Sequence, residues 1–179
     1  MRALLVAALL ASPAALATLA PATAAAGTYV SVGLGTTPVG QGDLAVTTTA
    51  GDSEVPQQRV ALGQSLGRVA IEASLARFGI GAGDGVAAGV HARLSVPLEG
   101  NFGAYGRLGL ERVWLSGIDP TFGDTADGMA AGLGLEYKLS APILGQAAIW
   151  GEVNQDQLTL DGDREGGVRM WMAGVSLGI

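Results

Sequence analysis

The strongest constraint in this sequence is an alternation of apolar residues with small or polar ones that recurs eight times. An extended strand places successive side chains on opposite faces, so period-two alternation predicts strands with one apolar and one polar face. The alternating segments are residues 29–35, 59–63, 69–75, 90–96, 105–111, 132–138, 148–153 and 171–179. The sequence therefore predicts an all-β protein with eight strands.

The connections between these segments alternate in length. The first, third, fifth and seventh are longer and more polar, and we expect them near residues 36–56, 80–86, 115–127 and 155–167. The second, fourth and sixth are short, at 67–68, 97–102 and 140–144. Long loops at one end and tight turns at the other are typical of barrels in outer membranes. The predicted fold class is an eight-stranded antiparallel up-and-down transmembrane β-barrel, with both termini at the periplasmic, short-turn end.

The N-terminal segment differs from the rest of the chain. It begins with one charged residue, Arg2, continues with an apolar run and ends in small residues at Ala24 to Ala26. These three features are typical of a secretory signal peptide. A membrane-anchoring helix is the alternative, but two prolines interrupt the stretch. We therefore expect residues 1–26 to be a cleaved signal peptide and residues 27–179 to be an outer-membrane β-barrel domain.

The composition argues against several function classes. A formal net charge of −6 at pH 7 disfavours a nucleic-acid partner, whose phosphates would repel the protein. The chain has no cysteine and a single histidine, His91, so thiolate chemistry and a histidine-rich metal site are excluded. Its 29 glycines suit turns and closely approaching strands better than helices, where each interior glycine costs ~1 kcal/mol. We expect no cofactor and no metal.

The two faces of the predicted strands differ in chemistry. One face is aliphatic, whereas the other carries four bases and four acids among small residues. Balanced charge is expected of groups enclosed together, because an unpaired buried charge costs several kcal/mol. A solvated face with mixed charges is the alternative, but every Asp falls in an expected loop or loop edge instead. The sequence predicts a filled lumen whose charge network comprises Arg59, Glu72, His91, Arg93, Arg107, Glu111, Glu136, Lys138 and Glu152.

Three arginines interrupt the aliphatic face. Arg77, Arg112 and Arg169 lie where their strands meet the expected long loops, and their parity points them outward. Trp114 and Trp171 share that face and level, as expected of an interfacial belt. An arginine costs only ~0–1 kcal/mol near the membrane interface, and its planar guanidinium matches phosphate. We expect these arginines to contact lipopolysaccharide at the extracellular rim; snorkelling side chains that contact water alone are the alternative.

Four of the alternating segments carry a resemblance. Residues 29–35, 69–79, 105–110 and 132–139 resemble strands of the small outer-membrane β-barrel family that includes OmpA-like transmembrane domains and Opa-type opacity proteins. The resemblance implies insertion into the outer membrane by the barrel-assembly machinery. Such barrels usually end in an aromatic residue, whereas this sequence ends in Ile179, and its aromatic content is only 5%.

The expected function is non-enzymatic: a structural or surface-interaction role through four extracellular loops, which contact an extracellular partner. An outer-membrane lipid-modifying hydrolase and a soluble lipocalin-type ligand-binding barrel are the alternatives. A hydrolase needs a base within reach of its nucleophile, but Ser95 lies ~13 Å along the strand from His91. A lipocalin would need an apolar cavity. The acidic stretches 119–127 and 161–165 could bind Ca²⁺ through oxygen ligands, although solvated loops account for them better.

Overall fold

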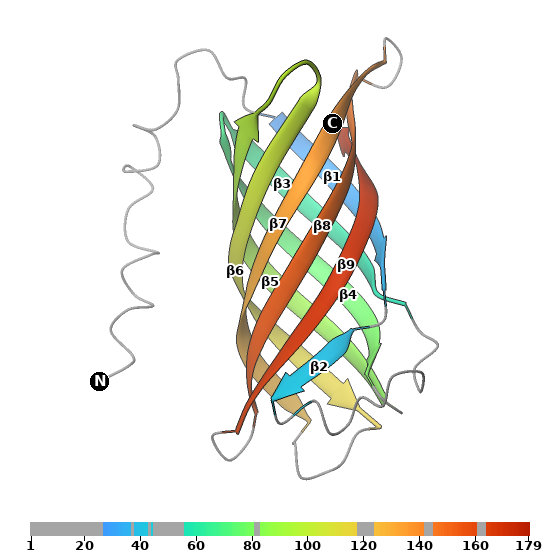
Figure 1. Ribbon diagram of the computed structural model, residues 1–179, viewed down its shortest axis with the longest axis vertical. Coiled ribbons are helices and arrows are strands. Elements are labelled where there is room, and N and C mark those ends of the chain that lie inside the picture. The colour runs from blue at the N-terminus through green and yellow to red at the C-terminus, as the bar shows by residue number, and fades with distance from the viewer. Residues whose placement is uncertain are drawn as a thin grey trace, which may run out of the picture.

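The computed structural model describes residues 27–36, 38–42, 44, 56–80, 83–117, 124–141, 145–160 and 164–179. The proposed signal peptide and parts of the long connections lie outside these residues. Nine strands form within the described part of the chain (Figure 1). They are β1 (Gly27–Gly35), β2 (Val39–Gly42), β3 (Gln58–Leu66), β4 (Val69–Ile80), β5 (Gly83–Pro97), β6 (Phe102–Ser116), β7 (Thr125–Ala141), β8 (Gly145–Leu160) and β9 (Arg164–Gly178).

Eight of these strands close into a barrel. Each strand from β3 to β8 pairs antiparallel with the next one in sequence. β1 pairs with β3 on one side and with β9 on the other, which closes the ring. The closing ladder runs from Tyr29 opposite Gly178 to Gly35 opposite Met172. Neighbours in sequence are therefore neighbours in space, and the predicted eight-stranded antiparallel up-and-down barrel is confirmed.

The short strand β2 continues β1 along the same edge of β9. Gly35 lies opposite Met172 and Val39 lies opposite Arg169. The segment from β1 to β2 therefore contains one residue more than the stretch of β9 that it faces. As a result, the ladder with β9 is interrupted between β1 and β2. The side chain of Thr36 bridges the interruption, because its Oγ1 accepts a hydrogen bond of 3.1 Å from the Trp171 amide.

The strands extend further toward the long-loop end than the sequence predicted. Residues 80–86 were expected as a loop, but β4 ends at Ile80 and β5 begins at Gly83. The expected loop 155–167 is likewise mostly strand in β8 and β9, and β6 and β7 reach into the expected loop 115–127. At the other end, Gly67 adopts a φ of 75° in the turn between β3 and β4, a left-handed conformation that favours glycine.

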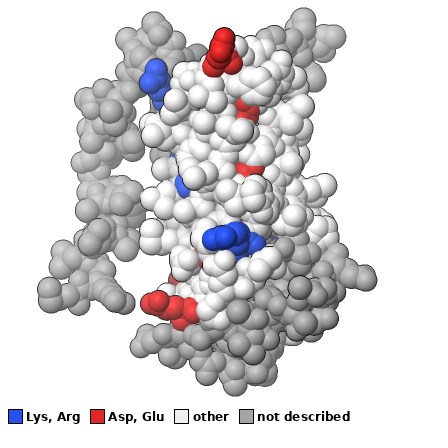
Figure 2. All heavy atoms as spheres, viewed as in Figure 1, with Lys and Arg blue, Asp and Glu red and all other residues white. Residues whose placement is uncertain are grey.

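Over most of its height the outer wall is aliphatic. Exposed side chains include Leu34 at 66%, Leu75 at 61% and Leu133 at 70%, with similar residues on every long strand. Figure 2 shows one side of this wall as a largely uncharged surface that is interrupted by a basic patch toward the long-loop end. Within the described residues, no helix is long and apolar enough to cross a membrane.

Toward the long-loop end the two faces of the wall exchange character. The inward side chains there are apolar and buried, and they include Phe78, Ile80, Val113, Leu115, Leu158, Leu160, Val168 and Met170. The outward side chains there are polar, and they include Arg77, Asp84, Arg112, Asp127, Gln155, Gln157, Thr159 and Arg169. The alternation therefore continues with its polarity inverted, which is why the sequence reading took this part of the strands for polar loops.

Candidate functional site

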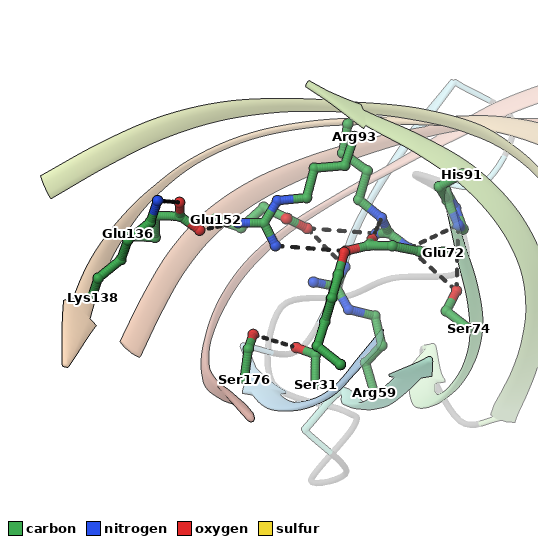
Figure 3. Close-up of polar contacts among 12 residues, drawn as sticks. Ser31, Arg59, Glu72, Ser74, His91, Arg93, Glu136, Lys138, Glu152 and Ser176 are labelled. Carbon is green, nitrogen blue, oxygen red and sulfur yellow. Dashed lines mark hydrogen bonds and ion pairs between the residues drawn. The ribbon is translucent and has the colours of Figure 1, made fainter. Parts of the chain in front are cut away.

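The middle of the barrel holds a continuous layer of ion pairs (Figure 3). Arg107 on β6 lies between two carboxylates: its Nε is 3.0 Å from Glu72 Oε2, and its Nη1 is 3.6 Å from Glu152 Oε1. Arg59 on β3 pairs with Glu152 at 2.7 Å. Arg93 on β5 pairs with Glu72 at 3.5 Å and also with Glu136 on β7. These side chains are at most 10% exposed.

Each arginine of this layer shares a partner with another. The chain of pairs runs Glu136, Arg93, Glu72, Arg107, Glu152 and Arg59, and it joins six strands from β3 to β8. Tyr29, on β1, adds a hydrogen bond of 2.5 Å from its hydroxyl to Glu72 Oε1. Because buried charges are stable only when they are paired, this layer ties opposite sides of the barrel together.

Aromatic rings line the layer, and glycines on neighbouring strands make room for them. The ring of Trp150 lies where a Cβ on Gly33 or Gly174 would be, and the Tyr105 ring occupies the same position over Gly134. The guanidinium of Arg59 lies 4.9 Å from the centre of the Trp150 ring, a distance typical of a cation–π contact. Arg93 lies 3.7 Å from the centre of the Tyr105 ring. The glycine content thus has a specific use, since it lets large rings fit inside a narrow barrel.

His91 accepts a hydrogen bond within this layer. Its Nδ1 is 2.9 Å from Arg107 Nη2 and 3.5 Å from Ser74 Oγ. Arginine can only donate, so Nδ1 is the acceptor and the proton of the neutral ring is on Nε2. Spacing along one strand points to Ser95, whereas the serine that contacts His91 is Ser74, on the neighbouring strand β4. The pair does not resemble a nucleophile and its base, because the lone pair of Nδ1 faces Arg107 and His91 is only 2% exposed.

The predicted lumen residues do not all join the layer. Lys138 does not lie in the enclosed layer, because its side chain is 62% exposed and 3.8 Å from Glu136 at the short-turn mouth. Glu111 points inward but makes no ion pair with a described residue. Asp156 corrects the expectation that every Asp lies in a loop, since it lies within β8 and is buried in the lumen. Tyr29 and Trp150 share the inward parity of the charged residues, but only the register of the strands shows that they contact them; Asp156 was missed because residues 155–167 were expected to form a loop.

An apolar cluster fills the lumen on the long-loop side of the charged layer. It contains Phe78, Ile80, Val113, Leu158, Val168 and Met170, all at most 3% exposed. Leu44, which follows β2 in the chain, is fully buried in the same cluster. The sequence reading expected only charged and small residues inside, so this apolar cluster is a correction. It forms because the inward face becomes apolar where the outward face becomes polar.

The short-turn end of the lumen is open. A cavity of about 770 Å³ lies there, and Tyr29, Arg93, Ser95, Glu136 and Lys138 are among the residues that line it. From this end toward the long-loop end, the interior is therefore a polar cup, a charged layer and an apolar cluster. No three His, Asp or Glu side chains in the described part of the chain gather as a metal ion would require.

The three rim arginines lie on the outer wall near the long-loop end, but their partners differ. Arg112 donates two hydrogen bonds, of 2.7 and 2.8 Å, to the carboxylate of Asp127. Arg77 lies 3.6 Å from the carboxylate of Asp84. Arg169 donates one hydrogen bond of 3.0 Å to the amide oxygen of Gln155.

Comparison with known proteins identifies the fold. No protein-family model matches the chain, and no curated protein matches its sequence. Among solved structures, the chain is similar to Neisserial surface protein A (NspA), with a TM-score of 0.65 and 14% identity over 87% of this chain and 99% of that one. It is also similar to the N-terminal β-barrel domain of Pseudomonas aeruginosa OprF, with a TM-score of 0.54 and 14% identity over 86% and 98%. At this identity the likeness concerns the fold, and it agrees with the resemblance to small outer-membrane barrels.

Proposed function

We propose that this protein spans an outer membrane as a closed, non-conducting barrel and has a structural or surface-interaction role. The observation that carries the proposal is the inversion of polarity along the outer wall. Exposed aliphatic side chains cover most of the wall, and they give way to arginines, acids and amides near the long-loop end. A water-soluble barrel would present polar side chains over its whole height, whereas a membrane barrel presents an apolar band with polar ends.

The height of the apolar band fits a membrane. On β7 the outward residues from Met129 to Leu139 are apolar, without a charge among them. At ~3.4 Å per residue and a tilt of ~40°, this segment spans about 26 Å. The apolar band of outer-membrane barrels is ~25 Å tall. Trp114 and Trp171 are exposed on the outer wall, at 45% and 64%, and tryptophan is enriched at membrane interfaces.

The interior disfavours three other functions. An ion channel would need a continuous water path, but the apolar cluster and the charged layer fill the described lumen on the long-loop side of the cup. A lipocalin-type carrier would need an apolar cavity inside and a polar wall outside, and the arrangement here is the reverse. A lipid-modifying hydrolase is not supported by His91, which is buried and hydrogen-bonded to Arg107.

The partners follow from this placement. Residues 1–26 would direct export and be removed, and the barrel-assembly machinery would insert the mature domain. The long-loop end would then face outward, where four connections between strands are available to an extracellular partner. One of the similar structures is described as a surface protein, which agrees with such a role. Outer-membrane lipid and lipopolysaccharide would surround the wall.

Cell fractionation combined with a heat-modifiability gel tests the proposal. We expect the protein in the outer-membrane fraction, and we expect an unboiled sample to migrate differently from a boiled one, because folded barrels resist detergent until heated. Protease added to whole cells should cut only within the connections at the long-loop end. Recovery of the folded protein in the soluble periplasmic fraction would refute membrane insertion.

A further inference from the structure

The three outward arginines differ in how much of their charge is available to a ligand. Arg112 is neutralised by the two hydrogen bonds to Asp127, and Arg77 has the carboxylate of Asp84 at 3.6 Å. Arg169 has no carboxylate partner among the described residues; its Nε donates to Gln155, a neutral amide. Because only a net positive site attracts an anion strongly, the three positions are not equivalent.

Two amide side chains, Gln155 and Gln41, hold Arg169 in position. Gln155 lies directly opposite Arg169 in the ladder between β8 and β9, and its amide nitrogen donates a hydrogen bond of 3.3 Å to Gln41 on β2. These contacts fix the Nε side of the Arg169 guanidinium, and no described residue accepts a hydrogen bond from its two terminal nitrogens. A planar guanidinium with free terminal nitrogens is well suited to binding a phosphate oxygen pair.

An apolar groove begins directly below this polar cluster. Trp171 and Val153 face each other in the ladder, each two residues along from Arg169 and Gln155, and both line the groove. The groove has a volume of about 670 Å³, and it exists because the outward positions Ala104, Gly106 and Gly151 are small. Leu133 and Leu135 also line it. An elongated apolar chain that starts beside Trp171 would fit along this wall.

We propose that Arg169, held in place by Gln155, binds the anionic headgroup of a membrane lipid whose acyl chain lies in the groove over Ala104, Gly106 and Gly151. This inference rests on the proposed membrane insertion and makes it specific, because it assigns the lipid site to one of three arginines. The occupant combines a negative headgroup with an acyl chain, which matches one arginine above an apolar groove. A free anion would not use the groove, and an uncharged lipid would not use Arg169.

The test uses Trp171 as a reporter at the top of the groove. The chain has three tryptophans. Trp150 is enclosed in the lumen, so a Trp114→Phe background leaves Trp171 as the tryptophan on the outer wall. The full barrel is reconstituted in phosphatidylcholine vesicles that contain a small fraction of acyl-brominated phosphatidylglycerol or acyl-brominated phosphatidylcholine. We expect the anionic brominated lipid to quench Trp171 with an association constant roughly five-fold higher, the gain from one arginine at a membrane surface.

Three variants in the same background make the assignment specific. Arg169→Gln should reduce the preference for phosphatidylglycerol to about none, whereas Arg112→Gln, the matched control, should leave it unchanged. Gly151→Leu should lower the preference by filling the groove, since the outward position has room for a side chain, with only Met172 O within 4 Å. Inorganic phosphate should not compete at millimolar concentration. The same preference in Gly151→Leu as in the parent would overturn the role of the groove.

The outcomes separate this inference from the proposed function. If neither brominated lipid quenches Trp171, the wall does not face lipid and the proposed membrane insertion is wrong. If both quench it equally, the protein is inserted but the anionic site is refuted. Equal losses of preference in Arg169→Gln and Arg112→Gln would also refute it, because the effect would then reflect net charge alone.

Discussion

Removing the central arginine of the lumen should destabilise the barrel strongly. We choose Arg107→Met, because methionine keeps much of the apolar volume of the arginine stem and removes the charge. Arg107 contacts Glu72 at 3.0 Å, Glu152 at 3.6 Å and His91 at 2.9 Å. Breaking a buried ion pair by removing one partner costs ~3–5 kcal/mol. We expect the lower part of this range, about 3 kcal/mol, because Glu72 keeps Arg93 and Glu152 keeps Arg59.

The assay is urea unfolding of the protein refolded in lipid vesicles, followed by tryptophan fluorescence. Arg112→Met is the matched control, since Arg112 forms an ion pair of 2.7 Å with its side chain 57% exposed. An exposed ion pair contributes little to stability, so the control should leave the urea midpoint nearly unchanged. If Arg107→Met and Arg112→Met had the same effect, the lumen layer would be hydrated and the reasoning would be wrong.

The remaining predictions concern the lumen, the wall and the N-terminal segment. Glu136→Ala should also lower the urea midpoint, because Arg93 would lose one of its two carboxylate partners; an unchanged midpoint would mean that Glu136 is solvated. The folded protein should show no large, stable single-channel currents in planar bilayers, and such currents would contradict a filled lumen. Gly174→Val should prevent formation of the heat-modifiable species, because its Cβ would overlap the Trp150 ring and the Val32 carbonyl oxygen, whereas Gly151→Val should fold. Mass spectrometry of the exported protein should give a chain that begins at Gly27, and an uncleaved N-terminus would favour a membrane anchor.

The inverted part of the wall shows where reading the sequence failed. Val113 and Leu115 alternate with Arg112 and Trp114 just as earlier residues of β6 alternate, but here the apolar residues point inward. Period two identifies a strand and divides its residues between two faces, yet it does not say which face is in contact with water. A single polarity for the whole barrel therefore predicts loops at residues where the strands in fact continue.

The charged layer shows a related limit. The positions of Arg59, Arg93, Arg107, Glu72, Glu136 and Glu152 on one face followed from parity alone. Their pairing did not, because it depends on register and strand tilt: Arg59 and Glu152 are 93 residues apart in sequence and make a contact of 2.7 Å. Tyr29 and Asp156 face the lumen by the parity of their strands, and Lys138 lies outside the layer because its side chain is 62% exposed near the short-turn mouth.

The sequence by itself determined the architecture. Eight alternating segments with tight connections at one end leave few arrangements besides a closed meander, since antiparallel neighbours pair locally and closure removes both edges. Only the tertiary structure decided which charged side chains pair and where the lumen becomes apolar. It also showed which of the three rim arginines has no carboxylate partner among the described residues. The physical reason is that alternation is a property of one strand, whereas ion pairing and burial depend on the register between strands that are distant in sequence.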